Sequence, residues 1–319
     1  MRKLICLTAL CLLTATVAAE TVVVSLEKDN AIAILDAQEG KLNKTVPVGQ
    51  RPRGIALSAD QKSLFVATSD DHTIKIFDTS SWKESGRLPS GEDPETFALS
   101  PDGKLMYVSN EDDSQVTVID IAAKKAIKTI KVGVEPEGIA ASADGKWLVS
   151  ASETTNMLHW IDTQNWSIVE NTLVDPRPRA ASFTADSVEL WATSEMAGTV
   201  VVVDAASKQI THTIKLEVPG LNNDLIQPVG VLIDKNRRYA YVALGPANRV
   251  AVINAKTYQV EQYLLVGQRV WNLAFSSDQQ RLFTTNGLSN DVSIIDLANF
   301  KVTKSVAVGR YPWGVAVKP

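Results

Sequence analysis

Short segments in which apolar and polar residues alternate recur along the chain, and each ends in an aspartate or an asparagine. The segments are AIAILD, TIKIFD, QVTVID, MLHWID, TVVVVD, RVAVIN and DVSIID, and they end at Asp36, Asp78, Asp120, Asp162, Asp204, Asn254 and Asp296. Successive end residues are 42 positions apart in every step except one, which is 50. Because alternation of this kind is typical of half-buried strands, the pattern predicts a repeated β-sheet unit.

Two further markers keep the same register. Prolines recur at Pro52, Pro94, Pro136, Pro178, Pro228 and Pro312, with Val270 in the remaining place. Glycines recur at Gly49, Gly91, Gly133, Gly267 and Gly309. Since all three markers are consistent with one irregular step, the repeat runs through the whole chain after its first residues.

Each unit is predicted to contain four short strands separated by turns. In one unit the strands are TFALS, LMYVSN, QVTVID and AIKTIKV, and Ser100–Gly103 has the Ser-Pro-Asp-Gly composition of a tight turn. One position in the second strand is aromatic in five units, and we expect its side chains to pack between neighbouring units: Phe65, Tyr107, Trp191, Tyr241 and Phe283.

The two ends of the repeat region complement each other. Residues 21–49 contain the later strands of a unit without its first strand, whereas Tyr311–Val317 has the pattern of a first strand alone. Joined, they form one unit, and with six complete units this gives seven. The sequence therefore predicts an all-β fold: a seven-bladed β-propeller of four-stranded antiparallel blades, closed by a blade shared between the two ends.

The first 19 residues have the composition of an export signal. Arg2 and Lys3 precede the apolar stretch Leu4–Val17, and Val17-Ala18-Ala19 predicts cleavage after Ala19. Residues 20–319 then form the propeller domain, which we expect to be periplasmic and without a membrane span. Lipidation is the alternative, because Cys6 and Cys11 lie in this segment, but Leu10 before Cys11 is not the small residue that a lipoprotein signal requires.

Cleavage would remove both cysteines and change the formal net charge from 32 − 36 = −4 to 30 − 36 = −6. The exported domain would have no disulfide and would depend on its apolar core. Its mild acidity gives no electrostatic reason to expect duplex nucleic acid as a partner.

The residues on either side of each repeat proline are the candidate binding residues. In a strand these two positions point to one side, and the loops entering the first strands open on the face of a propeller that commonly carries function. The candidates for this channel mouth are Arg51, Arg53, Asp93, Glu95, Glu135, Glu137, Arg177, Arg179, Arg269, Trp271, Tyr311 and Trp313. Two acidic blades would then lie between two basic blades, opposite an aromatic and arginine-containing wall.

Two interpretations of these residues remain open and are compatible. In the first, neighbouring blades exchange structural ion pairs, Arg53 with Glu95 and Glu137 with Arg179. In the second, the arginine and aromatic wall binds a planar or anionic group, and the carboxylates contact a cation. The eight extra residues around Glu217–Asp224 would lie on the same face, either as a neutral insertion or as a partner-contact loop.

Catalytic and cofactor motifs are not found. The three histidines, His72, His159 and His212, occupy different repeat positions, and His72 replaces an asparagine in a predicted turn. The acidic segments Asp70-Asp71 and Glu111–Asp113 could attract calcium, but hairpin turns explain them better. We therefore predict no catalytic residue, no metal and no cofactor.

The segments LFVATSDD, MYVSNEDD and LFTTNGLSNDVSIID, with the preceding PxGIAxSxDGK pattern, resemble the YVTN-type β-propeller repeat family over the whole chain after the signal. In size, export signal and seven-unit layout, the chain is most similar to a branch of periplasmic propellers associated with pyrroloquinoline-quinone-dependent alcohol catabolism. This resemblance implies an accessory role beside a quinoprotein system. The quinoprotein dehydrogenases themselves resemble a larger eight-bladed propeller with a vicinal disulfide, which this chain cannot form.

The leading hypothesis is therefore a monomeric, non-enzymatic periplasmic module that binds another protein or a small ligand. A haem-handling or redox-accessory propeller is one alternative and would require His72 or His159 at the channel mouth. A metal-dependent lactonase-type hydrolase would instead require Glu and Asn or Asp ligands converging in the channel. Binding of single-stranded nucleic acid is disfavoured by the net acidity.

Overall fold

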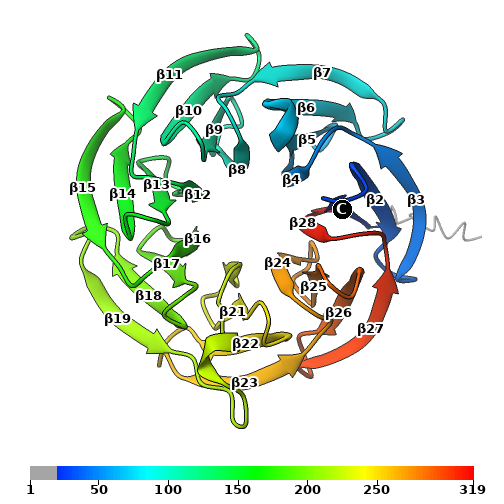
Figure 1. Ribbon diagram of the computed structural model, residues 1–319, viewed down its shortest axis with the longest axis vertical. Coiled ribbons are helices and arrows are strands. Elements are labelled where there is room, and N and C mark those ends of the chain that lie inside the picture. The colour runs from blue at the N-terminus through cyan, green and yellow to red at the C-terminus, as the bar shows by residue number, and fades with distance from the viewer. Residues whose placement is uncertain (1–19) are drawn as a thin grey trace, which may run out of the picture.

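The computed structural model describes residues 20–319, and seven four-stranded antiparallel sheets form a ring around a central channel (Figure 1). The predicted fold is confirmed. The expected export signal, its cleavage site and the two cysteines lie outside the described residues. Within residues 20–319, no helical segment has the length and apolarity that crossing a bilayer requires.

The blades follow the chain in order. The first four comprise β28 (Pro312–Lys318), β1 (Thr21–Leu26), β2 (Ala31–Asp36) and β3 (Lys41–Pro47); β4 (Pro52–Leu57), β5 (Ser63–Thr68), β6 (Thr73–Asp78) and β7 (Glu84–Pro89); β8 (Pro94–Leu99), β9 (Leu105–Asn110), β10 (Gln115–Asp120) and β11 (Lys125–Lys131); and β12 (Pro136–Ala141), β13 (Trp147–Ser152), β14 (Met157–Asp162) and β15 (Ser167–Leu173). The last three comprise β16 (Pro178–Phe183), β17 (Glu189–Ser194), β18 (Thr199–Asp204) and β19 (Ile210–Lys215); β20 (Val231–Ile233), β21 (Tyr239–Ala243), β22 (Arg249–Asn254) and β23 (Val260–Leu265); and β24 (Val270–Phe275), β25 (Arg281–Asn286), β26 (Asp291–Asp296) and β27 (Lys301–Ala307). We number the blades 1 to 7 in this order.

The ring closes in blade 1, as predicted. Strand β28 pairs antiparallel with β1, with Thr21 opposite Lys318 and Val22 opposite Val317. One sheet therefore joins the last described strand to the first: β28 is the innermost strand of blade 1, and β1 is paired on both sides.

The core is divided among the seven junctions between neighbouring blades, and each junction holds one cluster of buried apolar side chains. The predicted aromatic residues belong to these clusters, and each is at most 3% exposed: Phe65, Tyr107, Trp191, Tyr241 and Phe283. Burial at the junctions holds each blade against both of its neighbours.

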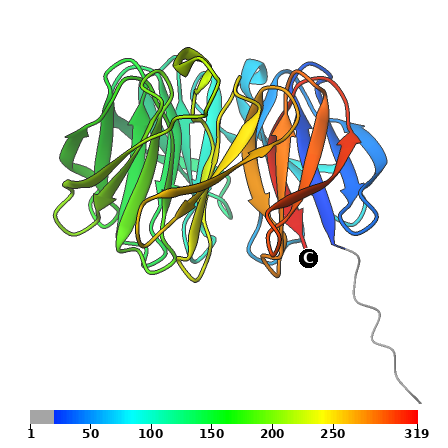
Figure 2. The ribbon, with the colours of Figure 1, turned by 90° about the horizontal axis from the view of Figure 1, so that it is seen from below.

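The loops entering the inner strands and the turns between second and third strands lie on one face, which we call the mouth face. The short 3-10 helices η1 (Ser69–Asp71) and η2 (Asn223–Leu225) lie on this face, whereas the described chain begins and ends on the opposite face (Figure 2). The eight-residue insertion is therefore on the mouth face, as expected. It packs Val218 and Ile226 against blades 5 and 6 and leads into β20, which has only three residues.

Glycines allow the inner strands to approach each other closely. The position two residues after the repeat proline is glycine in four blades: Gly54, Gly138, Gly230 and Gly314. A Cβ on Gly138 would lie 2.6 Å from the backbone oxygen of Arg179 and 2.8 Å from the Cα of Ala180 in the next blade. Because both obstacles are backbone atoms, the neighbouring strand itself would have to shift.

We predict that Gly138→Ala lowers the free energy of unfolding by about 1–3 kcal/mol, the usual cost of overpacking a rigid contact. Urea denaturation would measure it. Gly86→Ala is the matched control, because the nearest atom there is the mobile Nζ of Lys124. Equal stability of the two variants would contradict the proposed close contact.

Candidate functional site

The backbone before each inner strand has a conformation that the strand pattern did not predict. The residue preceding the repeat proline, or preceding Val270 in blade 7, lies outside the strand. In six blades it has a positive φ: Arg51 49°, Asp93 45°, Glu135 56°, Arg177 64°, Arg269 57° and Tyr311 54°. A residue before proline normally prefers an extended backbone. The expectation that both residues flanking the proline follow one strand alternation was therefore wrong for the first of them.

Turn side chains hold this left-handed residue in place. The backbone N–H of Arg51 donates to Asn30 Oδ1 at 3.0 Å, and that of Arg269 donates to Asn248 Oδ1 at 2.8 Å. In blade 3, the N–H of Asp93 donates to Nδ1 of His72 at 3.1 Å. His72 is therefore a turn residue, as expected, and takes the role of asparagine.

The residue after the proline is fixed from the preceding blade. Its backbone oxygen accepts a hydrogen bond from Ser25 Oγ at Arg53 (2.7 Å) and from Thr285 Oγ1 at Trp313 (2.6 Å). The backbone that carries the mouth side chains is therefore held by hydrogen bonds both before and after the proline position.

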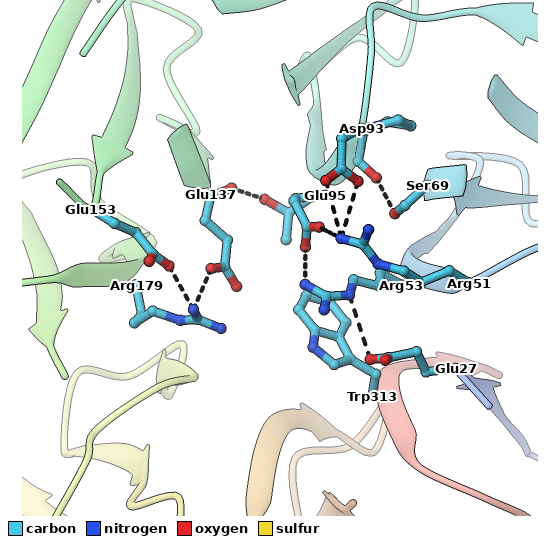
Figure 3. Close-up of polar contacts among 12 residues, drawn as sticks. Glu27, Arg51, Arg53, Ser69, Asp93, Glu95, Glu137, Glu153, Arg179 and Trp313 are labelled. Carbon is cyan, nitrogen blue, oxygen red and sulfur yellow. Dashed lines mark hydrogen bonds and ion pairs between the residues drawn. The ribbon is translucent and has the colours of Figure 1, made fainter. Parts of the chain in front are cut away.

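The first ion-paired group joins blades 1, 2 and 3 (Figure 3). Glu95 is fully buried and binds the guanidinium groups of both Arg51 and Arg53. Arg51 also lies 3.1 Å from Asp93, and Arg53 Nε lies 3.5 Å from Glu27. The predicted pair of Arg53 with Glu95 is therefore present as part of a larger network.

The second group is centred on Arg179, which is 8% exposed. Its Nη1 lies 2.7 Å from Glu137 and 2.6 Å from Glu153, so the predicted pair of Glu137 with Arg179 is also present (Figure 3). Arg177 lies 2.9 Å from Glu153 and 3.0 Å from Glu195.

The remaining candidate residues have other neighbours. Trp271 lies beneath two guanidinium groups, with Arg269 at 4.3 Å and Arg179 at 5.8 Å from its ring centre. Trp313 is 5.5 Å from the Arg53 guanidinium. Tyr311 instead lies beside Lys28, and Glu135 accepts a hydrogen bond from the Thr154 hydroxyl. These last two residues are therefore not part of either ion-paired group.

A further set of mouth residues was not predicted from the sequence. Glu27, Glu111, Glu153 and Glu195 each follow the second strand of a blade, and Ser69 has the same place in blade 2. Three of these glutamates pair with the mouth arginines: Glu27 with Arg53, and Glu153 and Glu195 with Arg177. Their positions keep the 42-residue spacing, so the repeat register itself contained the signal.

Crowding of carboxyl groups shifts their ionisation. Burial, followed by the charge of Glu95 and a hydrogen bond with it, raises the pKa of Glu111 to about 8. Burial likewise raises the pKa of Glu137 well above its usual range, despite Arg179. Burial opposes ionisation of Glu153 too, but a hydrogen bond from Glu137 and the charges of Arg179 and Arg177 lower its pKa below the usual range. Of these two coupled carboxyl groups, Glu137 is therefore protonated in preference to Glu153.

Below the mouth lies the channel, with a volume of about 290 Å³. The inner strands of all seven blades line it, and Glu137, Arg179 and Trp313 reach it from the mouth. A cavity of this size approaches the volume of sites that bind small molecules.

The other histidines lie away from the mouth. His159 is in β14, where Nε2 accepts the N–H of Gly133 at 2.8 Å and Nδ1 lies 2.6 Å from Asn171 Oδ1. His212, in the outermost strand of blade 5, stacks on Tyr258 at 3.7 Å between ring centres. Since both ring nitrogens of His159 have partners, this residue does not fit the axial-ligand role that a tetrapyrrole site would require.

We predict that Glu137→Gln and Glu153→Gln differ in stability at pH 7 although both replace a buried carboxyl. The amide introduced by Glu137→Gln can still donate to Glu153, so its cost should remain below about 1 kcal/mol, whereas Glu153→Gln removes a charge bound by two arginines and should cost about 1.5–3 kcal/mol. Chemical denaturation would measure both values. A larger loss for the first variant would contradict the assigned ionisation states.

A second prediction concerns pH. The folded pKa of Glu111 is raised to about 8 from an ordinary value of 4.5, so the stability associated with its proton is complete below pH 4.5 and is lost as the pH rises to 8. The melting temperature of Glu111→Gln should therefore rise relative to wild type between pH 5 and pH 8.5. Asp112→Asn, at the exposed neighbour, should give a curve parallel to that of wild type; parallel curves for all three proteins would refute the assignment.

Comparison with known proteins supports the fold and identifies the family. The described architecture is similar to a chain of Kuenenia stuttgartiensis hydrazine synthase, with a TM-score of 0.79 and 20% identity over 87% of this chain and 92% of that one. It is also similar to a functionally unknown protein from Desulfotomaculum acetoxidans DSM 771, with a TM-score of 0.78 and 14% identity over 93% of this chain and 98% of that one. At these identities the likeness concerns the fold alone. No curated protein matches the sequence.

A family model, by contrast, matches the sequence directly. The match extends over residues 30–231 and is to the model described as YNCE-like beta-propeller. It covers more than half of the chain, from blade 1 to the start of blade 6. The chain therefore belongs to the YNCE-like β-propeller family.

Proposed function

We propose that this protein is a periplasmic, non-catalytic binding or docking module, an accessory of a quinoprotein alcohol-oxidation system, and that it recognises its partner with the mouth face. The observation that carries the binding role is the convergence of charged side chains from six blades on one opening. Arg51, Arg177 and Arg269 keep side-chain exposures of 26%, 45% and 23%, so the network is accessible from outside.

The construction of the mouth also favours recognition. Structural ion pairs need only two partners, but here four of the five mouth arginines each contact two or more acidic side chains. Aromatic rings lie beside three of the five. Charged groups held rigidly in a partly desolvated opening give specificity and fast association with a complementary partner.

The proposed association with a quinoprotein system rests on sequence resemblance and not on the geometry of the mouth. The YVTN-type repeats and the predicted export signal resemble those of periplasmic propellers associated with pyrroloquinoline-quinone-dependent alcohol catabolism. We therefore expect a quinoprotein dehydrogenase, its cytochrome or a periplasmic binding protein as the partner.

A pull-down from periplasmic extract of the native cells, analysed by mass spectrometry, tests this function. We expect recovery of one of these partners, and we expect Arg177→Gln to reduce the recovery about tenfold, equivalent to about 1.4 kcal/mol of binding free energy. Lys104→Gln is the matched control, because it removes an exposed positive charge from the turn between β8 and β9 on the opposite face.

Melting temperatures would confirm that both variants remain folded. If no component of a quinoprotein system is recovered, the accessory role is refuted. If Arg177→Gln and Lys104→Gln bind the partner equally well, docking through the mouth face is refuted.

A further inference from the structure

The exposed apolar side chains of the molecule are concentrated on one part of the mouth face. Of the ten large apolar side chains that are exposed among residues 20–319, six lie in loops, turns or strand ends on this face. They extend from the loop entering blade 4 to the turn of blade 7, and we call them the apolar arc: Val134, Leu173, Met196, Leu225, Leu265 and Leu288. Met196 is 73% exposed and Leu288 is 52% exposed, so both side chains are available to a partner.

The same asymmetry is present at one position of the turn between the second and third strands. This position is charged in blades 1, 2 and 3 and apolar in blades 5, 6 and 7. The six residues are Lys28, Asp70, Asp112, Met196, Pro246 and Leu288. Because they occupy equivalent places in the blades, the change from charged to apolar follows the ring and is not scattered over it.

A second position of the repeat changes in the same direction. The residue two places before the repeat proline is polar or charged in blades 1, 2 and 3 and apolar in blades 4, 5 and 6. These residues are Arg310, Gln50, Glu92, Val134, Pro176 and Ile226. The two positions together divide the mouth face into a polar half and an apolar half. Concentrations of exposed apolar side chains with a polar border are typical of protein interaction sites.

The polar half carries acidic side chains that the protein does not neutralise. Lys28 and Arg310 are each paired with a neighbouring acidic residue. Glu92 and Asp112 are exposed, and no lysine or arginine in the described part of the chain forms an ion pair with either of them. A partner that covers both halves would therefore gain from positive charge opposite blade 3.

The apolar half is hollowed as well as exposed. A depression of about 190 Å³ lies between blades 4 and 5, and its lining includes Pro176, Arg177 and Met196. Protein interfaces commonly depend on a few side chains that fill pockets of this kind. The arc therefore offers a place for an anchoring side chain beside its most exposed residue.

A second copy of this chain would not complement the mouth face. In a face-to-face dimer, a two-fold axis through blade 6 would bring the two apolar arcs together, but it would also place blade 2 on blade 3 of the copy. Asp70 and Asp112 would then face acidic turns across the interface. An anionic bilayer would likewise repel Glu92 and Asp112. The charge pattern therefore favours a different protein as the occupant.

We infer that the apolar arc is the docking surface for another protein, whose matching surface has an apolar patch bordered on one side by lysine or arginine side chains that face Glu92 and Asp112. The inference rests on the docking role proposed for the mouth face and names the chemistry of the partner's surface. Apolar burial would supply affinity, and the opposite charges would fix the orientation of the partner on the ring.

Photocrosslinking in the native cells tests the inference with the full-length protein. The probe is p-benzoylphenylalanine in place of Leu288, and the matched control carries it in place of Ile127, which is 49% exposed on the outermost strand of blade 3. We expect ultraviolet light to join the Leu288 probe, but not the Ile127 probe, to one other protein. Mass spectrometry of the adduct identifies that protein.

Isothermal titration with the purified crosslinked protein then measures the contribution of each half. Met196→Ser and Leu288→Ser should each weaken binding about tenfold, the effect of losing one buried apolar side chain, whereas Ile127→Ser should change the affinity less than about twofold. Glu92→Gln combined with Asp112→Asn should weaken binding about threefold at low salt and reduce its salt dependence. Melting temperatures would confirm that the variants remain folded.

An adduct between two copies of this chain, or the absence of any adduct specific to the Leu288 probe, would overturn the inference. Co-sedimentation with phosphatidylcholine and phosphatidylglycerol vesicles that Leu288→Ser abolishes would also overturn it, because the arc would then be a membrane-binding surface. Equal effects of Leu288→Ser and Ile127→Ser, or an affinity unchanged by the two acidic substitutions, would have the same consequence.

The inference and the proposed function can fail separately. A crosslinked protein from outside any quinoprotein system, with the expected effects of the variants, would support the apolar arc and contradict the accessory role. A quinoprotein component whose binding depends on Arg177 but not on Met196 or Leu288 would support the accessory role and overturn the inference.

Discussion

The contact between neighbouring inner strands is the constraint on which the mouth depends. Each blade has a side chain, a glycine or a backbone N–H close to the carbonyl that follows the proline of the next blade, as Ser25 does at Arg53 and Gly138 at Arg179. Closure through β28 and β1 makes this chain of contacts circular, so no blade can move outward without disturbing two others. Long charged side chains can therefore converge from separate blades with little freedom left in the backbone that carries them.

The left-handed conformation of the residue before the proline directs its side chain differently from that of a residue in a continuous strand. Non-glycine residues rarely adopt this conformation, and here asparagine or histidine side chains of the preceding blade hold it by hydrogen bonds. One consequence is visible at Arg51, which contacts Asp70 in its own blade and Asp93 and Glu95 in the next. Local strain and the ring geometry act together to link neighbouring blades through their charges.

Repetition made the fold and much of the mouth predictable from the sequence, because a residue's place in the repeat determines its place in the blade. Blade number, closure, the aromatic positions and the pairs of Arg53 with Glu95 and of Glu137 with Arg179 could all be derived in this way. The glutamates after the second strands had the same register but were overlooked, since they lie at the edge of a turn. The direction in which a long side chain turns was not predictable: Glu111 interacts with Glu95 in its own blade, whereas Glu153 reaches Arg179 in the next.

Departures from the repeat indicate where the seven blades stop being equivalent. The insertion before blade 6 shortens β20 and places Gln227 where other blades carry charged or aromatic residues, and Val229 follows its proline. Arg269 then contacts Gln227 at 3.0 Å and reaches Glu195 at 3.3 Å, so it links blades 7 and 5 across the uncharged blade between them. The network is thus continued across the uncharged blade by Arg269. The seven blades thus share one backbone architecture, but the few positions that depart from the repeat make the charge distribution around the mouth asymmetric.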